Sequence, residues 1–386
     1  MRCQSSARHC GGYPDLGRSI LPTGAFVGWH ERSLLLEQNQ AQLVAHFLGD
    51  YLPPEGSVPT RHQSPVYWAE LFPTFLHSQS PVIKASLSAL TLIHLAKSRH
   101  DDALAHRSRQ HYRQAVQQIC ALKGKDDPSH LIRTAMILAL YELYAQPPGQ
   151  GHAWNVHVTA ACNLAREHRA AMLNNQDRQR LRTIEFLRKC VNVSDGVSAV
   201  NRSPMGLSTD RFDLLLDILS EIGQLRSGLR HQIARNGVTW DSTACLLMTS
   251  ACLENQLLSW YHKWQSETNH PLFTIRSTTV PPAAMHPRQP EETMFFTDPS
   301  GIPHLLLYWL GLVLLYATVA ETLRGLTSEQ VRSRTIQQRL TKADALCHHF
   351  ATRLAQCQSG CTGKGTGTAI LAAAAWQAAQ SVRAVS

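Results

Sequence analysis

Cysteine, charge and secretory signals are all scarce in this chain of 386 residues. Its ten cysteines are too few for a small disulfide scaffold, in which cysteine exceeds about 8% of the chain. The first twenty residues contain no apolar run of the roughly 7–15 residues that a secretory signal requires. Charged residues make up only 17%, but 44% of the chain is apolar, which excludes wholesale disorder. We therefore expect a soluble intracellular protein with a core of its own.

Strand-like patterns are also nearly absent. Alternation of apolar and polar residues is found in one short β-like piece, at 272–280. Helical periodicity dominates instead, as in the segment 81–98, where Ile83, Leu87 and Leu90 fall on one stripe. The sequence therefore predicts an all-α fold. Further helices are expected at 102–122, 128–144, 154–170, 178–192, 210–233, 242–265, 305–323, 328–355 and 369–382.

One stretch resembles a membrane span. Leu305–Ala320 is sixteen residues long and is followed by Glu321 and Arg324. A helix needs about 20 apolar residues to cross a bilayer, so this length favours a buried helix. We expect no membrane partner.

Two proline-rich segments have no periodicity and are predicted to be loops. The first, 53–65, holds four prolines, and the second, 271–303, holds seven of the chain's nineteen. A long irregular segment inside a compact domain is usually functional or disordered. The second loop would separate a larger N-terminal helical block from a C-terminal one.

No enzyme motif is recognisable. Gly360–Lys364 resembles a phosphate-binding loop, but it has two residues where four are needed, and Gly365 stands where Ser or Thr is required. A group of thiols and imidazoles overlaps it, yet a single helix cannot surround a zinc ion with four ligands, so buried thiols and surface histidines are expected. We predict no catalytic residue and no enzyme. The group is Cys347, His348, His349, Cys357 and Cys361.

The net charge of +9 permits a polyanionic partner without naming one. Seven basic and three acidic residues lie between Arg166 and Lys189. Arg178, Arg180 and Arg182 alternate, so a helix would spread them over different faces. This favours a solvated face over a nucleic-acid-binding surface.

The first residues resemble a known family. Cys3 and Cys10 are separated by six residues, and Gly12-Tyr13 follows. This resembles the end of the six-cysteine binuclear zinc cluster of fungal transcription factors. In that family six thiolates hold two zinc ions and a helix of the cluster enters the major groove of DNA.

The rest of the chain resembles the α-helical fungal-specific transcription factor domain that accompanies such clusters. The resemblance is spread over residues 30–325. It rests on several short motifs that occur in the family's order, and no single motif is sufficient. It implies structural roles for six residues. These are Trp68 (in WAELFPTF), Tyr112, Tyr141 and Glu142 (in LALYEL), and Trp154 and His157 (in Trp-x-x-His).

The resemblance implies a nuclear regulator of RNA polymerase II transcription, with residues 1–30 a disordered zinc-cluster remnant and residues 31–386 the regulatory domain. Its expected partners are DNA through the cluster, co-regulators or the transcription machinery, and a possible second copy. The chain departs from the family in two places. Ala160-Ala161 follows the Trp-x-x-His pair where Gly-Ala is usual, and four of the six cysteines are missing.

Two thiolates cannot close a tetrahedral zinc site, so Cys3 and Cys10 are not expected to bind zinc by themselves. Either Met1 is a misassigned start and the full-length protein holds zinc in a complete cluster, or the chain is a relative that acts without one. We favour the first, because the end of a cluster has no use by itself. For the chain as given, no cofactor is expected.

Two other functions stay open. The chain could be an α-helical scaffold or adaptor with no direct role in transcription, whose grooves bind partner helices. It could also be an enzyme whose site is assembled from scattered residues such as Glu142, His157 and Cys162. A deep pocket that gathers such groups would favour the enzyme.

Overall fold

The computed structural model describes thirteen ranges of the chain. The ranges do not include the first 28 residues, with Cys3 and Cys10, and they do not include Trp68. By contacts the chain divides into two units, Met1–Asn39 and Gln40–Ser386, and the described part of the first is the beginning of one helix. The described ranges are 29–52, 75–76, 78, 80–122, 127–145, 153–168, 175–191, 210–236, 239–268, 270–277, 292–326, 333–361 and 365–385.

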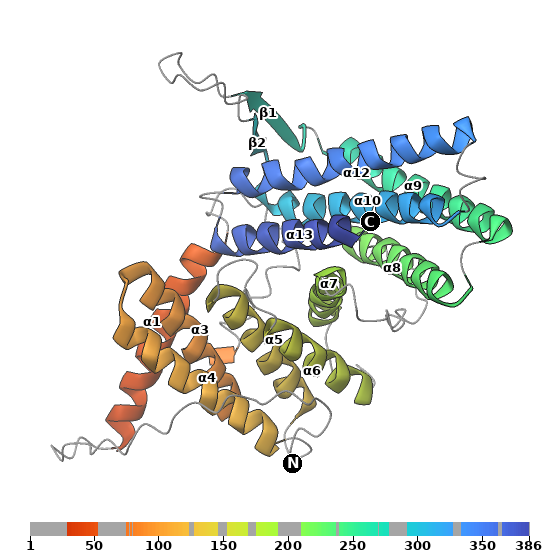
Figure 1. Ribbon diagram of the computed structural model, residues 1–386. Helices are drawn as coiled ribbons and strands as arrows, with labels where there is room; N and C mark the ends of the chain where they lie inside the picture. The colour runs from red at the N-terminus through yellow and green to blue at the C-terminus, as the bar shows by residue number, and fades with distance from the viewer. Residues whose placement is uncertain are drawn as a thin grey trace. The chain divides into compact units, whose positions relative to one another are not determined.

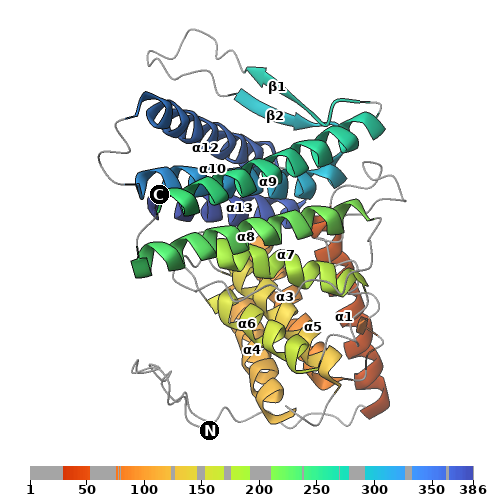
Figure 2. The ribbon, with the colours of Figure 1, turned by 90° about the vertical axis from the view of Figure 1, so that its right-hand side faces the viewer.

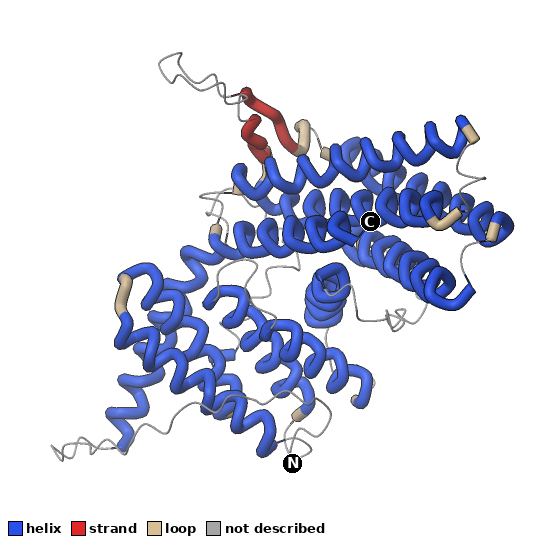
Figure 3. The backbone as a smooth tube through the Cα atoms, viewed as in Figure 1, coloured by secondary structure: helices blue, strands red, loops and turns tan. Residues whose placement is uncertain are grey.

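Helices make up nearly all of the described residues, which confirms the all-α prediction (Figures 1 and 3). Each expected helix is present with shifted ends, and α1 had not been expected. The eleven helices in these ranges are α1 (Trp29–Tyr51), α3 (Pro81–Arg99), α4 (Asp102–Leu122), α5 (Pro128–Ala145), α6 (Ala153–Glu167), α7 (Asn175–Val191), α8 (Arg211–Asn236), α9 (Trp240–Glu267), α10 (Ile302–Arg324), α12 (Arg334–Gly360) and α13 (Thr366–Val385).

Two neighbouring residues, His100 and Asp101, set the boundary between α3 and α4. His100 ends α3 in the left-handed conformation, with φ of 52°. The carboxylate of Asp101 then accepts hydrogen bonds from the amides of Ala103 and Leu104, at 2.9 and 3.0 Å. A capping carboxylate satisfies amides that have no partner inside the helix, so it fixes where α4 begins.

Within the unit that begins at Gln40, the helices form two groups joined by α7. In the first group α3 packs against α4 and α5, and α5 packs against α6. In the second group α10 packs against α8, α9, α12 and α13, and it lies between α12 and α13 in Figures 1 and 2. Helix α7 contacts α6 on one side and α8 and α13 on the other.

The apolar stretch at 305–320 lies inside α10, the central helix of the second group. Of the 23 residues of α10, nineteen are buried. Among the described residues, Pro299–Arg324 is the one segment long and apolar enough to cross a membrane, and 89% of its most apolar window is buried inside the protein. The core helix of a soluble protein passes the same test.

The proline-rich range 271–303, predicted to be a loop, contains both strands of a small sheet. β1 (Phe273–Ser277) pairs antiparallel with β2 (Glu292–Phe296), and Phe273 lies opposite Phe296. Met294 and Phe296 are buried, and β2 packs against α12. β1 falls within the expected β-like piece, whereas β2 was not expected.

The basic residues of α7 do not form the solvated face that their sequence favoured. Arg180 and Arg188 are buried. The carboxylate of Asp177 lies 3.6 Å from Arg180 Nη1 and 3.1 Å from Arg133 Nη2. Arg182 reaches Asp217 of α8 at 2.5 Å. Acidic groups from the same helix and from α8 offset the arginines, and such partners cannot be read from one segment of sequence.

Candidate functional site

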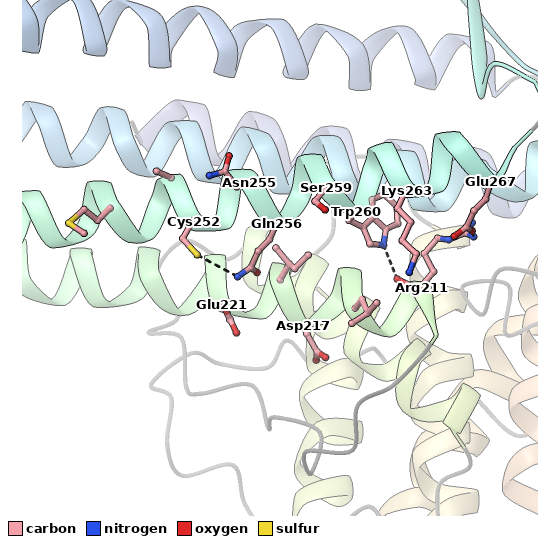
Figure 4. A pocket seen from close by; sticks show the side chains of 14 residues that line it. Arg211, Asp217, Glu221, Cys252, Asn255, Gln256, Ser259, Trp260, Lys263 and Glu267 are labelled. Carbon is pink, nitrogen blue, oxygen red and sulfur yellow. Dashed lines mark hydrogen bonds and ion pairs between the residues drawn. The ribbon is translucent and has the colours of Figure 1, made fainter.

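Helices α8 and α9 form an antiparallel hairpin whose outer side is an open groove (Figure 4). Trp260 Nε1 donates a hydrogen bond of 2.9 Å to the carbonyl oxygen of Arg211. The guanidinium of Arg211 also forms an ion pair with Glu267. These contacts join the start of α8 to the end of α9, and so fix the register of the two helices along the groove.

The groove has a volume of about 970 Å³. Its lining residues recur every three or four positions along both helices, which places them on one face of each. Leu214 and Ile218 supply apolar surface from α8, and Met248 and Trp260 supply it from α9. A hollow this open cannot enclose a small ligand as a cavity does, but it fits the apolar face of an amphipathic helix.

Two of the groove's large apolar side chains are exposed to solvent. Leu214 is 41% exposed and Met248 is 75% exposed. A single exposed apolar side chain needs no explanation, but two in one hollow are typical of an interaction site. Methionine suits such a surface because its unbranched side chain adapts to different partners.

The two ends of the groove carry different charges (Figure 4). Lys263 lies beside the Arg211–Glu267 ion pair at one end, and Glu221 lies about three turns away along α8. Asp217, between them, accepts from Arg182 of α7. A bound helix would therefore be favoured with its partly positive N-terminus near Glu221 and its C-terminus near Lys263.

A second hollow, of about 480 Å³, lies among α9, α10 and α12. Met248 and Ala251 line both hollows. Inside the second one the hydroxyl of Tyr316 donates a hydrogen bond of 2.6 Å to Glu254. Burial and this carboxylate raise the pKa of Tyr316. The phenol therefore stays protonated at neutral pH and acts as a donor.

Four of the residues that carry the family resemblance meet in one partly buried cluster, the Tyr112 cluster, made of Tyr112, Tyr141, Glu142 and His157. The hydroxyl of Tyr112 (α4) lies 2.8 Å from His157 Nε2 (α6). Its ring stacks on that of Tyr141 (α5), with centroids 4.7 Å apart. Tyr112 also hydrogen-bonds to Glu142 of α5. The cluster therefore ties three helices together through one phenol.

Burial controls protonation in the Tyr112 cluster. It lowers the pKa of His157 to about 4, so this imidazole is neutral at pH 7. It raises the pKa of Glu142, and the bond from Tyr112 opposes that shift. With an ionised Glu142, the phenol donates to the carboxylate and accepts from His157 Nε2–H. This arrangement satisfies buried polar groups, and it lines neither of the two hollows described above.

In the described structure Cys162 does not form a common site with Glu142 and His157. The groups that act electrostatically on its thiol include Glu185 and Arg188 of α7. Burial raises the pKa of Cys162 to about 12, so the thiol stays protonated at neutral pH and is a poor nucleophile. Trp154, the other described residue of the resemblance, is buried in the main apolar core.

The thiols and imidazoles of α12 lie on different faces of the helix. Cys347, Cys357 and Cys361 are buried, whereas His348 and His349 are exposed. The sulfurs of Cys357 and Cys361 are 3.8 Å apart. This is the arrangement expected when buried thiols pack in a core and histidines face solvent.

No family model, curated protein or solved structure matches the chain. The sequence predicted both helices and their apolar positions, but it did not predict the groove between α8 and α9. Periodicity marks which residues share a face, but only the packing of both helices shows which face is left without a neighbour.

Proposed function

We propose that the chain is a nuclear transcriptional regulator of the fungal zinc-cluster class, composed mostly of the helical regulatory domain, and that it is not an enzyme. The observation that carries the proposal is the Tyr112 cluster. Tyr112 and His157 are 45 positions apart in sequence, yet their side chains are hydrogen-bonded. A chance resemblance gives no reason for its residues to meet, whereas a shared domain does.

In this proposal the α8–α9 groove receives an amphipathic helix of a co-regulator. The exposed side chains of Leu214 and Met248 would contact its apolar stripe, since recognition of this kind uses anchors spaced along one helical face. Lys263 and Glu221 would orient it through its dipole. DNA would be bound through the complete six-cysteine cluster, of which Cys3 and Cys10 are the two members present, and zinc belongs to that cluster.

The groove also favours a second function, that of a scaffold or adaptor outside transcription. The physical interaction would be the same, and only its consequence would differ. An adaptor would remain in the cytoplasm and would leave transcription unchanged when it is brought to a promoter.

The proposal is tested by fusing the full chain to a DNA-binding domain of known site and measuring a reporter gene. The fusion should change reporter output, and the double variant Leu214→Glu/Met248→Glu should reduce that change about tenfold or more, because a charge buried in the interface costs well over 1.4 kcal/mol. Val156→Glu on α6 is the matched control, since Val156 is 68% exposed but lies outside the groove.

Each outcome separates the two functions. If the fusion leaves reporter output unchanged and the protein stays in the cytoplasm, the adaptor function is favoured. Equal loss in the groove variant and in the Val156→Glu control contradicts a specific role for the groove. Duplex DNA gives an independent test: the chain as given should bind weakly and without sequence preference, and tight specific binding would contradict our account of Cys3 and Cys10.

A further inference from the structure

Three metal-binding side chains converge where α1 passes α3. His46 and Asp50 lie one turn apart on the same face of α1, and His94 lies on α3. One ligand atom of each lies within 4.8 Å of the other two. His94 Nε2 and Asp50 Oδ2 are 3.0 Å apart. All three residues belong to the unit that begins at Gln40.

The surroundings hold α1 in this register. The side-chain nitrogen Nε2 of Gln40 donates to the carbonyl oxygen of Lys84, at 3.1 Å, and to Ser88 Oγ, at 3.2 Å. Phe47 lies between His46 and Asp50 in sequence, is fully buried, and packs edge-on against His94 with ring centroids 5.4 Å apart. The backbone around the three ligands is therefore fixed by contacts other than their own.

Tyr144 of α5 orients the imidazole of His94. The two side chains are joined at 2.6 Å through His94 Nδ1 and the phenol oxygen. Lys97 donates to the carbonyl oxygen of Tyr144, and its ammonium lies 5.7 Å from the centre of the tyrosine ring. A histidine that binds a metal commonly uses its other nitrogen in this way, because the bond fixes the tautomer and the ring orientation.

The three side chains differ in exposure as ligands of an open site should. His94 is 4% exposed, whereas the carboxylate of Asp50 is 49% exposed and His46 faces solvent. A metal held at about 2.0–2.1 Å by three such ligands keeps them roughly 3.3 Å apart. The His94–Asp50 pair is already near that separation. Rotation of the exposed His46 side chain can bring its ring nitrogen to the same distance from the other two ligand atoms.

We propose that His46, Asp50 and His94 form a binding site for a divalent transition-metal ion of the zinc type, with water in the open position. Two imidazoles and one carboxylate are the donors that such ions take in open protein sites. The ion would join α1 to α3. This site is separate from the six-cysteine cluster and does not depend on the proposed role in transcription.

Metal binding would move the ring proton of His94 from Nε2 to Nδ1, and the imidazole would stay neutral. Without metal, Nε2–H donates to Asp50, and Nδ1 accepts from the Tyr144 hydroxyl. With metal, the Nε2 lone pair would bind the ion and the Nε2 proton would pass to water. Nδ1 would take up a proton from water and donate a hydrogen bond to the phenol oxygen, so the imidazole stays neutral and no net proton is released. The competing explanation is that Asp50 and Tyr144 only satisfy a buried histidine.

The test is titration of the metal-stripped full chain with Zn²⁺ by calorimetry and with Co²⁺ by absorbance. We expect one ion per chain at this site and a Co²⁺ spectrum without the charge-transfer band of thiolate ligands. That spectrum is needed because the chain has ten cysteines. A thiolate spectrum at the tight site would overturn the proposal.

Variants locate the site. His46→Gln and Asp50→Asn should weaken binding by more than about 100-fold, which exceeds the roughly 10–100-fold expected for losing an orienting partner through Tyr144→Phe. Both ligand variants alter exposed groups, so circular dichroism should show an unchanged fold. His106→Gln, at an exposed histidine of α4, is the matched control and should bind as the unaltered chain does. Equal affinity in all variants would overturn the proposal.

Discussion

The Tyr112 cluster and the α8–α9 groove are both built from helices, but they place polar and apolar side chains in opposite ways. In the cluster, a phenol, an imidazole and a carboxylate lie among apolar neighbours and bond to one another. In the groove, Leu214 and Met248 face solvent. Polar groups satisfied inside a core hold helices together, whereas apolar groups left outside are available to a partner.

This comparison separates stability from binding. Changes in the first helical group should lower the free energy of unfolding, and any effect on binding should follow from unfolding. Changes in the groove should reduce binding while the free energy of unfolding stays nearly constant. A variant that breaks this division would show that the two regions are coupled.

The largest expected effect is that of Trp154→Ala. Trp154 is buried in the main core, on the helix that carries His157. Removal of such a ring leaves a cavity and should lower the free energy of unfolding by about 3–5 kcal/mol. Urea unfolding followed by circular dichroism measures this. A loss below about 1 kcal/mol would show that α6 contributes little to the core.

Acid should destabilise the protein through His157. Folding lowers its pKa from the ordinary 6.5 to about 4. The stability contributed by the neutral imidazole is therefore complete above pH 6.5 and is lost as the pH falls to 4, by at most about 3 kcal/mol. Glu142 acts in the opposite direction, because its raised pKa favours folding as the pH falls toward 4.5.

The difference between the unaltered chain and His157→Gln isolates the histidine. Both carry Glu142, so its contribution cancels to first order. Urea unfolding at several pH values should show a steeper loss below pH 6.5 in the unaltered chain. Parallel pH profiles would mean that folding leaves the pKa of His157 unchanged.

A smaller loss is expected for Tyr112→Phe. The ring and its stacking on Tyr141 remain, but His157 and Glu142 both lose the phenol as a partner. A buried polar group deprived of a partner costs about 1–3 kcal/mol, so we expect a loss of about 2 kcal/mol. Urea unfolding at pH 7 measures it, and an unchanged midpoint would show that water replaces the hydroxyl.

The helices were predictable because their apolar residues repeat with the period of the helix. Ile83, Leu87 and Leu90, expected on one stripe, are all buried in the core. Helix α1 was missed, and so was strand β2. The apolar residues of α1, such as Phe47, become core only through contact with α3 and α5, which no local pattern displays.

The candidate site was less predictable than the fold. The resemblance selected Tyr112 and His157, which do meet, but the arginines of α7 were expected on a solvated face, and Arg180 is buried beside Asp177. Pairing, burial and open grooves depend on which helices become neighbours. Sequence periodicity gives the faces of a helix without giving its neighbours.

The smallest effect on stability is expected in the groove. Met248→Ser shortens a side chain that is 75% exposed, so it should change the free energy of unfolding by no more than about 0.5 kcal/mol. Leu214→Ser, at a position that is 41% exposed, should cost no more than about 1 kcal/mol. Reporter output from the fused chain should still fall, because the atoms removed are those available to a partner helix. Val156→Ser, at a similarly exposed position on α6, should leave both measurements unchanged. A loss of stability at Met248 larger than at Val156 would mean that the groove is occupied by part of this chain, and it would remove the contrast with the Tyr112 cluster.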